Sequence, residues 1–163
     1  LAVRLRPIVW QSDANQKIQP EPFAGSLELL PREVEGRTLR HVLDVRDAAF
    51  VNADYVALAR KHGMATVFTD SDEHPSFADV TADFVYARLM RSRSDVPTGY
   101  PGTELDLWAR RAHEWADGGQ PDGLPCLGAG SPAPRITRDV FVFFISAAKG
   151  RNPAAAMALI ERL

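Results

Sequence analysis

The chain has 163 residues, of which 45% are hydrophobic and 25% charged, the composition of an ordinary globular domain. The length predicts one domain, residues 1–163, and the formal net charge of −2 argues against a protein that coats nucleic acid or an anionic membrane. No apolar run approaches the ~20 residues of a membrane span, and the single cysteine fits a reducing compartment, so we expect a cytoplasmic protein.

Short apolar segments alternate with longer helical stretches, which is typical of a parallel α/β fold. Strands are expected at residues 1–10, 39–45, 65–69, 84–89 and 139–144. Helices are expected to begin near Pro22, Ala53, Thr103 and Asn152. The last strand is almost wholly apolar and is expected to be buried on both faces. A Gly- and Pro-rich stretch, residues 118–138, is expected to be a loop insertion.

Helix boundaries are indicated by local residue chemistry. Asn52 is a suitable N-cap for the second helix, and Gly63 stands where a glycine commonly follows a helix end. Thr103, with Asp106 three residues later, resembles a capping box. These elements fit either an open doubly wound sheet or part of a barrel, and no Gly-rich phosphate-binding motif follows the first strand to favour the former.

Several strand ends resemble one family. Pro7–Gln11 (PIVWQ) resembles a "GPxLWQ" segment, Asp44–Phe50 resembles "ExRHxSF", and Phe84–Leu89 (FVYARL) resembles "FxYxRLHG". Weaker likenesses lie in Val67–Ser71 and in Val140–Phe144. These segments are similar to those of the YecE-like proteins, a family of unknown function with a TIM-barrel fold.

The resemblance implies a partial TIM (β/α)8 barrel, in which the five strands correspond to the fourth to eighth. Five strands cannot close such a barrel and would leave bare edges. We therefore expect the other strands in a part of the protein outside this chain or in another chain, or a homo-oligomer in which a second copy covers the edges. The remaining alternative is that the resemblance misleads and the sheet is small and open.

In a TIM barrel the functional side chains lie at the C-terminal ends of the strands. This rule predicts one convergent ring, formed by Gln11, Asp44, Arg46, Asp70, Tyr86, Arg88 and Ser146. Asp44 and Arg46 are two residues apart on a strand and so share a face, where Arg88 can join them.

Such a group can bind a small anionic ligand, a carboxylate or phosphate, and orient a general base. We predict Gln11, Arg46, Tyr86 and Arg88 as substrate-binding residues. Asp44 and Asp70 are the candidate catalytic bases. The alternative interpretation is a buried structural ion-pair network.

The sequence evidence for a functional site is weaker at two other charged segments. Residues 70–74 (DSDEH) offer oxygen and imidazole donors, but such runs are more often solvated loops, so we predict no metal site. The sequence leaves the cofactor unknown. Arg88, Arg91 and Arg93 leave a phosphate or nucleic-acid ligand open, although the near-neutral charge argues against nucleic acid.

Two classes of function remain open. The first is an enzyme acting on a small anionic substrate. The second is a non-catalytic binding or scaffold protein, because the chain departs from the family pattern at Asp47, at Met90–Arg91 and at Ile145–Ser146. If those positions carry chemistry in the family, that chemistry is lost or altered here.

Overall fold

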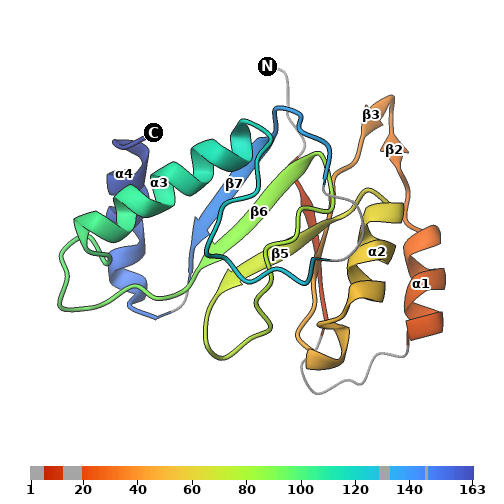
Figure 1. The fold of residues 1–163 in the computed structure, drawn as a ribbon, viewed down its shortest axis with the longest axis horizontal. Helices are drawn as coiled ribbons and strands as arrows, with labels where there is room; N and C mark the ends of the chain where they lie inside the picture. Colours follow the sequence, from red (N-terminus) through yellow and green to blue (C-terminus); the bar gives the residue numbers. More distant parts are fainter. Residues whose placement is uncertain (1–5, 13–19, 129–132, 146) are drawn as a thin grey trace.

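The structure is a computed structural model that describes residues 6–12, 20–128, 133–145 and 147–163. Five strands form its main sheet (Figure 1): β1 (Ile8–Gln11), β4 (His41–Asp44), β5 (Ala65–Asp70), β6 (Phe84–Leu89) and β7 (Asp139–Phe144). Its α-helices are α1 (Pro20–Glu28), α2 (Ala53–Lys61), α3 (Gly102–Ala116) and α4 (Asn152–Ile160). A hairpin of β2 (Glu33–Val34) and β3 (Arg37–Thr38) and the 3-10 turns η1 (Ala48–Phe50) and η2 (Lys149–Arg151) complete the described elements.

The strand order is β1-β4-β5-β6-β7, and every neighbouring pair is parallel. Each strand of the main sheet therefore lies beside the next one along the chain, without the reversal of order that defines a doubly wound sheet. The sheet is not closed, because β1 and β7 each pair with one neighbour only among the described residues. The predicted α/β class and its five parallel strands are confirmed.

The helices pack against one face of the sheet, which we call the outer face. On β6, the side chains of Val85, Ala87 and Leu89 belong to a core cluster shared with α3 and α4. On β4, Leu43 packs with residues of α1 and α2 in a second cluster. Figure 1 shows α3 and α4 at one end of the sheet and α1 and α2 at the other.

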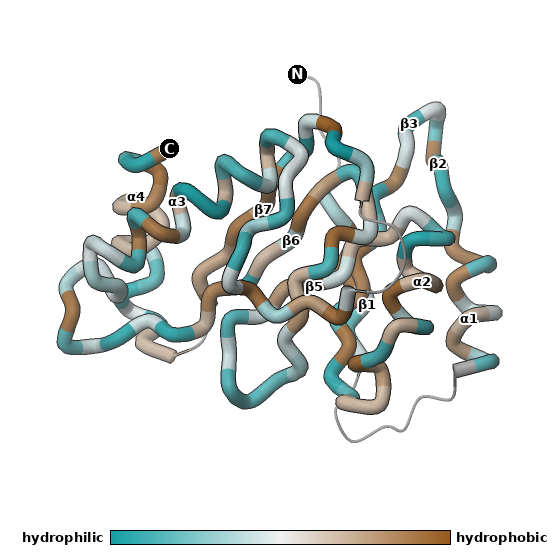
Figure 2. The backbone as a smooth tube through the Cα atoms, viewed as in Figure 1, coloured by the Kyte–Doolittle hydropathy of each residue, from teal (hydrophilic) through white to brown (hydrophobic). Residues whose placement is uncertain are grey.

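The opposite, inner face carries the alternate side chains of the strands. Val42, Val67 and Tyr86 form its core cluster, against which Phe141 and Phe143 of β7 pack. Figure 2 shows mainly hydrophobic residues along β6 and β7 and hydrophilic residues in the loop after β5. No described helix covers this face, because both helix-containing clusters involve outer-face residues.

Two local predictions are wrong, and one element was missed. The expectation that β7 is buried on both faces is wrong: Phe141 and Phe143 are half-buried, because β7 is an edge strand of an open sheet. The capping box at Thr103 is also wrong, since α3 begins at Gly102 after Pro101 and has no side-chain cap. The hairpin of β2 and β3 was not predicted at all.

Two local predictions, both at the ends of α2, are confirmed. The side chain of Asn52 accepts a hydrogen bond from the amide of Tyr55, and so caps α2 as expected. Gly63 follows the end of α2 with φ +60°, a conformation that favours glycine. Residues 118–128 and 133–138, the described parts of the predicted loop insertion, contain turns but neither helix nor strand. None of the described helices is long and apolar enough to cross a membrane.

Candidate functional site

The carboxylate of Asp44 is the centre of a charged group at the C-terminal end of β4. The Asp44 side chain is 2% exposed, and its Oδ2 accepts from Nη2 of Arg46 at 2.9 Å. The same oxygen accepts from Nη1 of Arg88, which projects from the inner face of β6. The two arginine side chains are 9% and 14% exposed. Two guanidinium groups thus share one buried carboxylate. The spacing of Asp44 and Arg46 predicted that these two side chains share a face, and Arg88 joins them from β6.

Strand β1 and the residue that follows it add two polar side chains to this group. Gln11 is the register partner of Asp44, and its Oε1 accepts from Nη1 of Arg88 at 3.3 Å. The hydroxyl of Ser12 accepts from the Arg46 amide at 2.9 Å, and the Ser12 amide donates to the Asp44 carbonyl at 3.0 Å. These bonds position the backbone of residues 44–46 relative to β1.

An aromatic pair lies beside the charged group on the inner face. The Cζ of Arg88 lies 5.9 Å from the ring centroid of Tyr86, within reach of a cation–π interaction. Tyr86 stacks on Phe143 of β7, with centroids 4.8 Å apart and an interplanar angle of 24°. Aromatic faces next to a guanidinium group provide an apolar wall for a bound ligand.

Asp70 belongs to a different ion-pair group. Its Oδ1 accepts from Nε of Arg91 at 2.9 Å, and Arg91 also makes two hydrogen bonds to Asp72, at 2.8 and 2.9 Å. On β5, Thr69 is the register partner of Arg88, whereas Asp70 pairs with Leu89 and faces the outer side. Burial raises the pKa of the Asp70 carboxyl, and the positive charge of Arg91 opposes that shift.

The structure thus brings together five of the predicted residues, Gln11, Asp44, Arg46, Tyr86 and Arg88, and places Asp70 apart from them. Ser146, the seventh member of the predicted ring, lies outside the described residues. Within the described chain, no group of three or more His, Cys, Asp or Glu side chains is arranged to hold a metal ion.

The positions that depart from the family pattern have structural contacts. Asp47 caps η1 by accepting from the amide of Ala49 at 2.9 Å. The backbone amide of Met90 donates to the carbonyl of Asp70, and the backbone amide of Ile145 donates to the carbonyl of Leu89.

Two residues of the group were not predicted from the sequence. Ser12 directly follows Gln11, and small hydroxyl residues at strand ends commonly bond to neighbouring backbone, which could have drawn attention to it. Phe143 gave no such signal, because its place opposite Tyr86 depends on the pairing of β6 with β7.

The family described as "Protein of unknown function DUF72" matches residues 1–163. The chain belongs to this family. A solved crystal structure of a DUF72 family protein from Thermotoga maritima is 18% identical to this DUF72 chain, with a TM-score of 0.63. The match covers 98% of this chain and 56% of the other, so this chain spans little more than half the length of that protein. No curated protein matches the chain.

The family match confirms the resemblance to YecE-like proteins that the strand-end motifs indicated. The structural likeness, at 18% identity, shows a shared fold. Neither comparison names a reaction, a ligand or a partner for these proteins.

Proposed function

We propose that this DUF72 chain binds a small carboxylate or phosphate ligand at the C-terminal ends of β1, β4 and β6 and acts on it as an enzyme. The observation that supports the proposal most is the charge of the group: Arg46 and Arg88 both bond to Asp44, so two positive charges meet one negative charge. A small anion would balance the remaining positive charge and satisfy free guanidinium donors.

The free donors are identifiable. The Nε of Arg46 is buried and has no hydrogen-bond partner, a state that is rare for a charged group in a folded protein. Arg88 is the more exposed of the two arginines, at 14%, and lies against the Tyr86 ring. We therefore assign the first contact with the ligand to Arg88, and the adjoining contact to Arg46.

The assignment of a base follows from position. Asp44 touches both anion-binding arginines, so it is the carboxylate nearest to a ligand held by them. Its Oδ2 accepts both arginine bonds, which leaves Oδ1 as the oxygen available to a substrate proton. Asp70 is the second candidate base and would act from the outer side of β5.

The fold context of this site is a second part of the proposal. A parallel sheet in chain order, with all helix clusters on one face, is the winding of a (β/α)8 barrel. We propose that the five strands are the fourth to eighth of such a barrel, with the inner face toward its interior. Further strands or a second copy of the chain would then cover the β1 and β7 edges.

A non-catalytic binding protein is the other candidate function. The observation that favours it is that the Asp47 side chain caps η1, which is a structural role, where the family pattern has another residue. In that case the anion-binding contacts would persist without turnover.

Binding is tested first, by NMR titration of the 17.9 kDa chain with inorganic phosphate and, separately, with malonate. The amides of Ser12 and Arg46 should shift saturably with at least one probe. Arg88→Gln should weaken that response about tenfold, the loss expected for one charge-assisted hydrogen bond. Unchanged binding by Arg88→Gln would contradict the proposal.

The matched control is Arg40→Gln. Arg40 also pairs with a single aspartate, Asp139, at 2.6 Å, but at the opposite ends of the strands. Its replacement should leave the response at Ser12 intact. A screen of phosphate esters and carboxylic acids then tests catalysis: turnover abolished by Asp44→Asn supports the enzyme, and binding without any turnover supports the non-catalytic alternative.

A further inference from the structure

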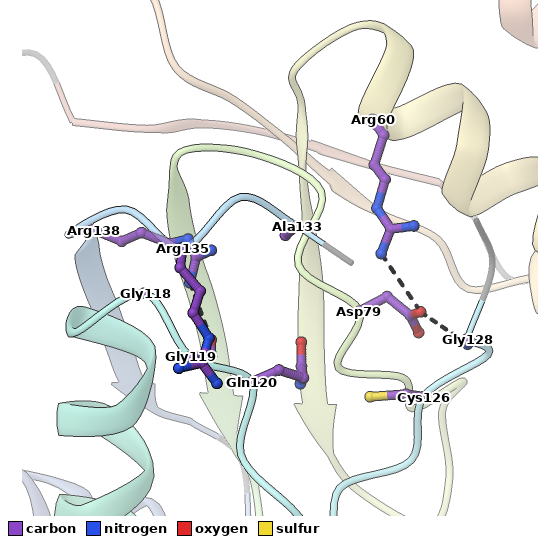
Figure 3. A pocket seen from close by; sticks show the side chains of 10 residues that line it. All are labelled: Arg60, Asp79, Gly118, Gly119, Gln120, Cys126, Gly128, Ala133, Arg135 and Arg138. Carbon is purple, nitrogen blue, oxygen red and sulfur yellow. Dashed lines mark hydrogen bonds and ion pairs between the residues drawn. The ribbon is translucent and has the colours of Figure 1, made fainter. Parts of the chain in front are cut away.

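A separate pocket of about 330 Å³ lies at the other edge of the sheet, where the strands begin. Its walls come from the end of α2, the loop before β6, the turn after α3 and the segment that leads into β7. Figure 3 shows the side chains that matter most: Arg60, Asp79, Gln120, Cys126, Arg135 and Arg138. The pocket shares no lining residue with the charged group around Asp44.

One side of the pocket is electrically balanced. Arg60 forms an ion pair with Asp79 at 3.9 Å, and Arg60 Nε also donates to the Val80 carbonyl at 3.1 Å. Asp79 accepts from the amides of Leu127 and Gly128, at 2.7 and 3.1 Å. These bonds, two of which Figure 3 marks, join residues 127 and 128 to the loop before β6 and that loop to the end of α2. The carboxylate of Asp79 is thus occupied by groups on its own side.

The other side of the pocket carries positive charge without a described counter-charge. Arg138 is 7% exposed, and its guanidinium group donates to the carbonyls of Gly119 (3.0 Å), Trp115 (3.4 Å) and Pro134. None of the ion pairs among the described residues includes Arg138, and its buried Nε has no partner. Burial lowers the pKa of Arg138.

A buried guanidinium group without a counter-charge is costly, because carbonyl oxygens replace only part of its hydration. A neutral side chain with N–H donors could form the hydrogen bonds to these three carbonyls equally well, so the bonds alone do not explain a charged residue at this position. Arg135, three residues earlier and exposed, adds a second guanidinium group to the lining, and it too takes part in no ion pair among the described residues. The lining therefore holds three arginines and one aspartate, which gives it an excess of positive charge.

We propose that this pocket is a second anion-binding site, in which Arg135 and Arg138 hold the phosphate or carboxylate group of a small molecule. The Arg60–Asp79 pair lines the far side of the pocket. The site is independent of the proposed function, because the strand ends at Asp44 lie at the opposite edge of the sheet.

The test is an NMR titration with inorganic phosphate and, in a second arm, with malonate. The amides of Gly118, Gly119 and Gly128 line the pocket and should shift saturably. Response to phosphate alone identifies a phosphate ligand, and response to malonate alone identifies a carboxylate. Arg135→Gln should weaken binding about tenfold. The absence of any saturable shift with either probe would overturn the proposal.

Two controls separate this site from other effects. Arg110→Gln removes an exposed arginine of α3 that does not line the pocket, and this variant should bind the probe as the parent does. Equal weakening of binding by Arg110→Gln and Arg135→Gln would mean a general charge effect and would overturn the proposal. Arg88→Gln should leave the glycine shifts unchanged. Removing the Arg138 side chain can disturb the loop that it contacts, so the deciding variant is Arg135→Gln, at an exposed position. Arg138→Lys is the second variant. It keeps the positive charge and should retain part of the affinity for the probe.

Discussion

The carboxylate of Asp44 accepts a hydrogen bond from the guanidinium group of Arg88, across a strand that belongs to neither residue. Asp44 ends β4 and Arg88 lies in β6, while β5 runs between them. The two strands share no backbone hydrogen bonds in the main sheet, so this ion pair links them directly over the inner face. The pair therefore ties β4 to β6 across the inner face, at the place where we propose that a ligand binds.

Asp44→Asn should lower the free energy of unfolding by about 3 kcal/mol, because it leaves two largely buried guanidinium groups without their counter-charge. Urea denaturation measures the loss. The matched control is Asp139→Asn, which removes the partner of Arg40 from an ion pair whose aspartate is 58% exposed. That change should cost less than about 1 kcal/mol. Similar losses for both variants would show that Asp44 contributes no more than a surface pair.

A pair of glycine substitutions tests the packing of the turn after α3. Gly118 has φ +87°, and a Cβ there would lie 2.6 Å from the carbonyl oxygen of Ile136. Gly118→Ala should therefore destabilise the fold by about 2 kcal/mol or more. Gly25 lies inside α1, and a Cβ there would have no other atom within 4 Å, so Gly25→Ala should stabilise the helix by up to about 1 kcal/mol. If the Tm of Gly118→Ala and the Tm of Gly25→Ala shift in the same direction, this interpretation is contradicted.

Much of the fold could be predicted because its signals are local. The run of apolar residues in β7 has the bounds that the structure gives, Asp139–Phe144, and Asn52 caps α2. The contact between Asp44 and Arg46 followed from their spacing of two residues near a strand end. Arg88 joined them because parallel strands bring their C-terminal ends to one edge of a sheet.

The features that were missed depend on register and on three-dimensional context. Thr69 and Asp70 are adjacent at the end of β5, and only the pairing with β6 shows that Thr69 shares a face with Arg88 while Asp70 does not. The β2–β3 hairpin has two residues in each strand, too few for a periodic signal, although Gly36 has the positive φ of 74° that such turns favour.

Stability should fall at mildly acidic pH because of His62. Its Nδ1 lies 2.9 Å from Nη2 of Arg32, which can only donate, so the ring is neutral in the fold. Burial, and then the charge of Arg32, lower the pKa of His62. In the unfolded chain this imidazole takes up a proton near pH 6.5. The unfolded state therefore binds more protons below that pH, and the free energy of unfolding decreases as the pH falls from about 6.5 toward the lowered pKa.

The test compares urea denaturation at pH 7.5 and pH 5.5. His62→Gln keeps an acceptor for Arg32 but cannot take up a proton, so this variant should lose less stability between the two pH values than the parent. His113→Gln, a change at an exposed position of α3, should keep the parental pH dependence. If His62→Gln loses as much free energy of unfolding between pH 7.5 and pH 5.5 as the parent does, the acid sensitivity comes from other groups.

The half-buried aromatic residues of β7 should make the chain self-associate. Phe141 and Phe143 lie on the inner face of an edge strand, a location that proteins normally cover. Sedimentation velocity should show concentration-dependent association. Phe143→Lys should reduce it by placing a charge on the face beside Tyr86, whereas Leu29→Lys, at a position 85% exposed beyond α1, should not. Since Phe143→Lys also breaks the stack with Tyr86, its thermal unfolding has to be cooperative for the comparison to count. A parent that stays monomeric at all concentrations would mean that this face needs no second copy to cover it.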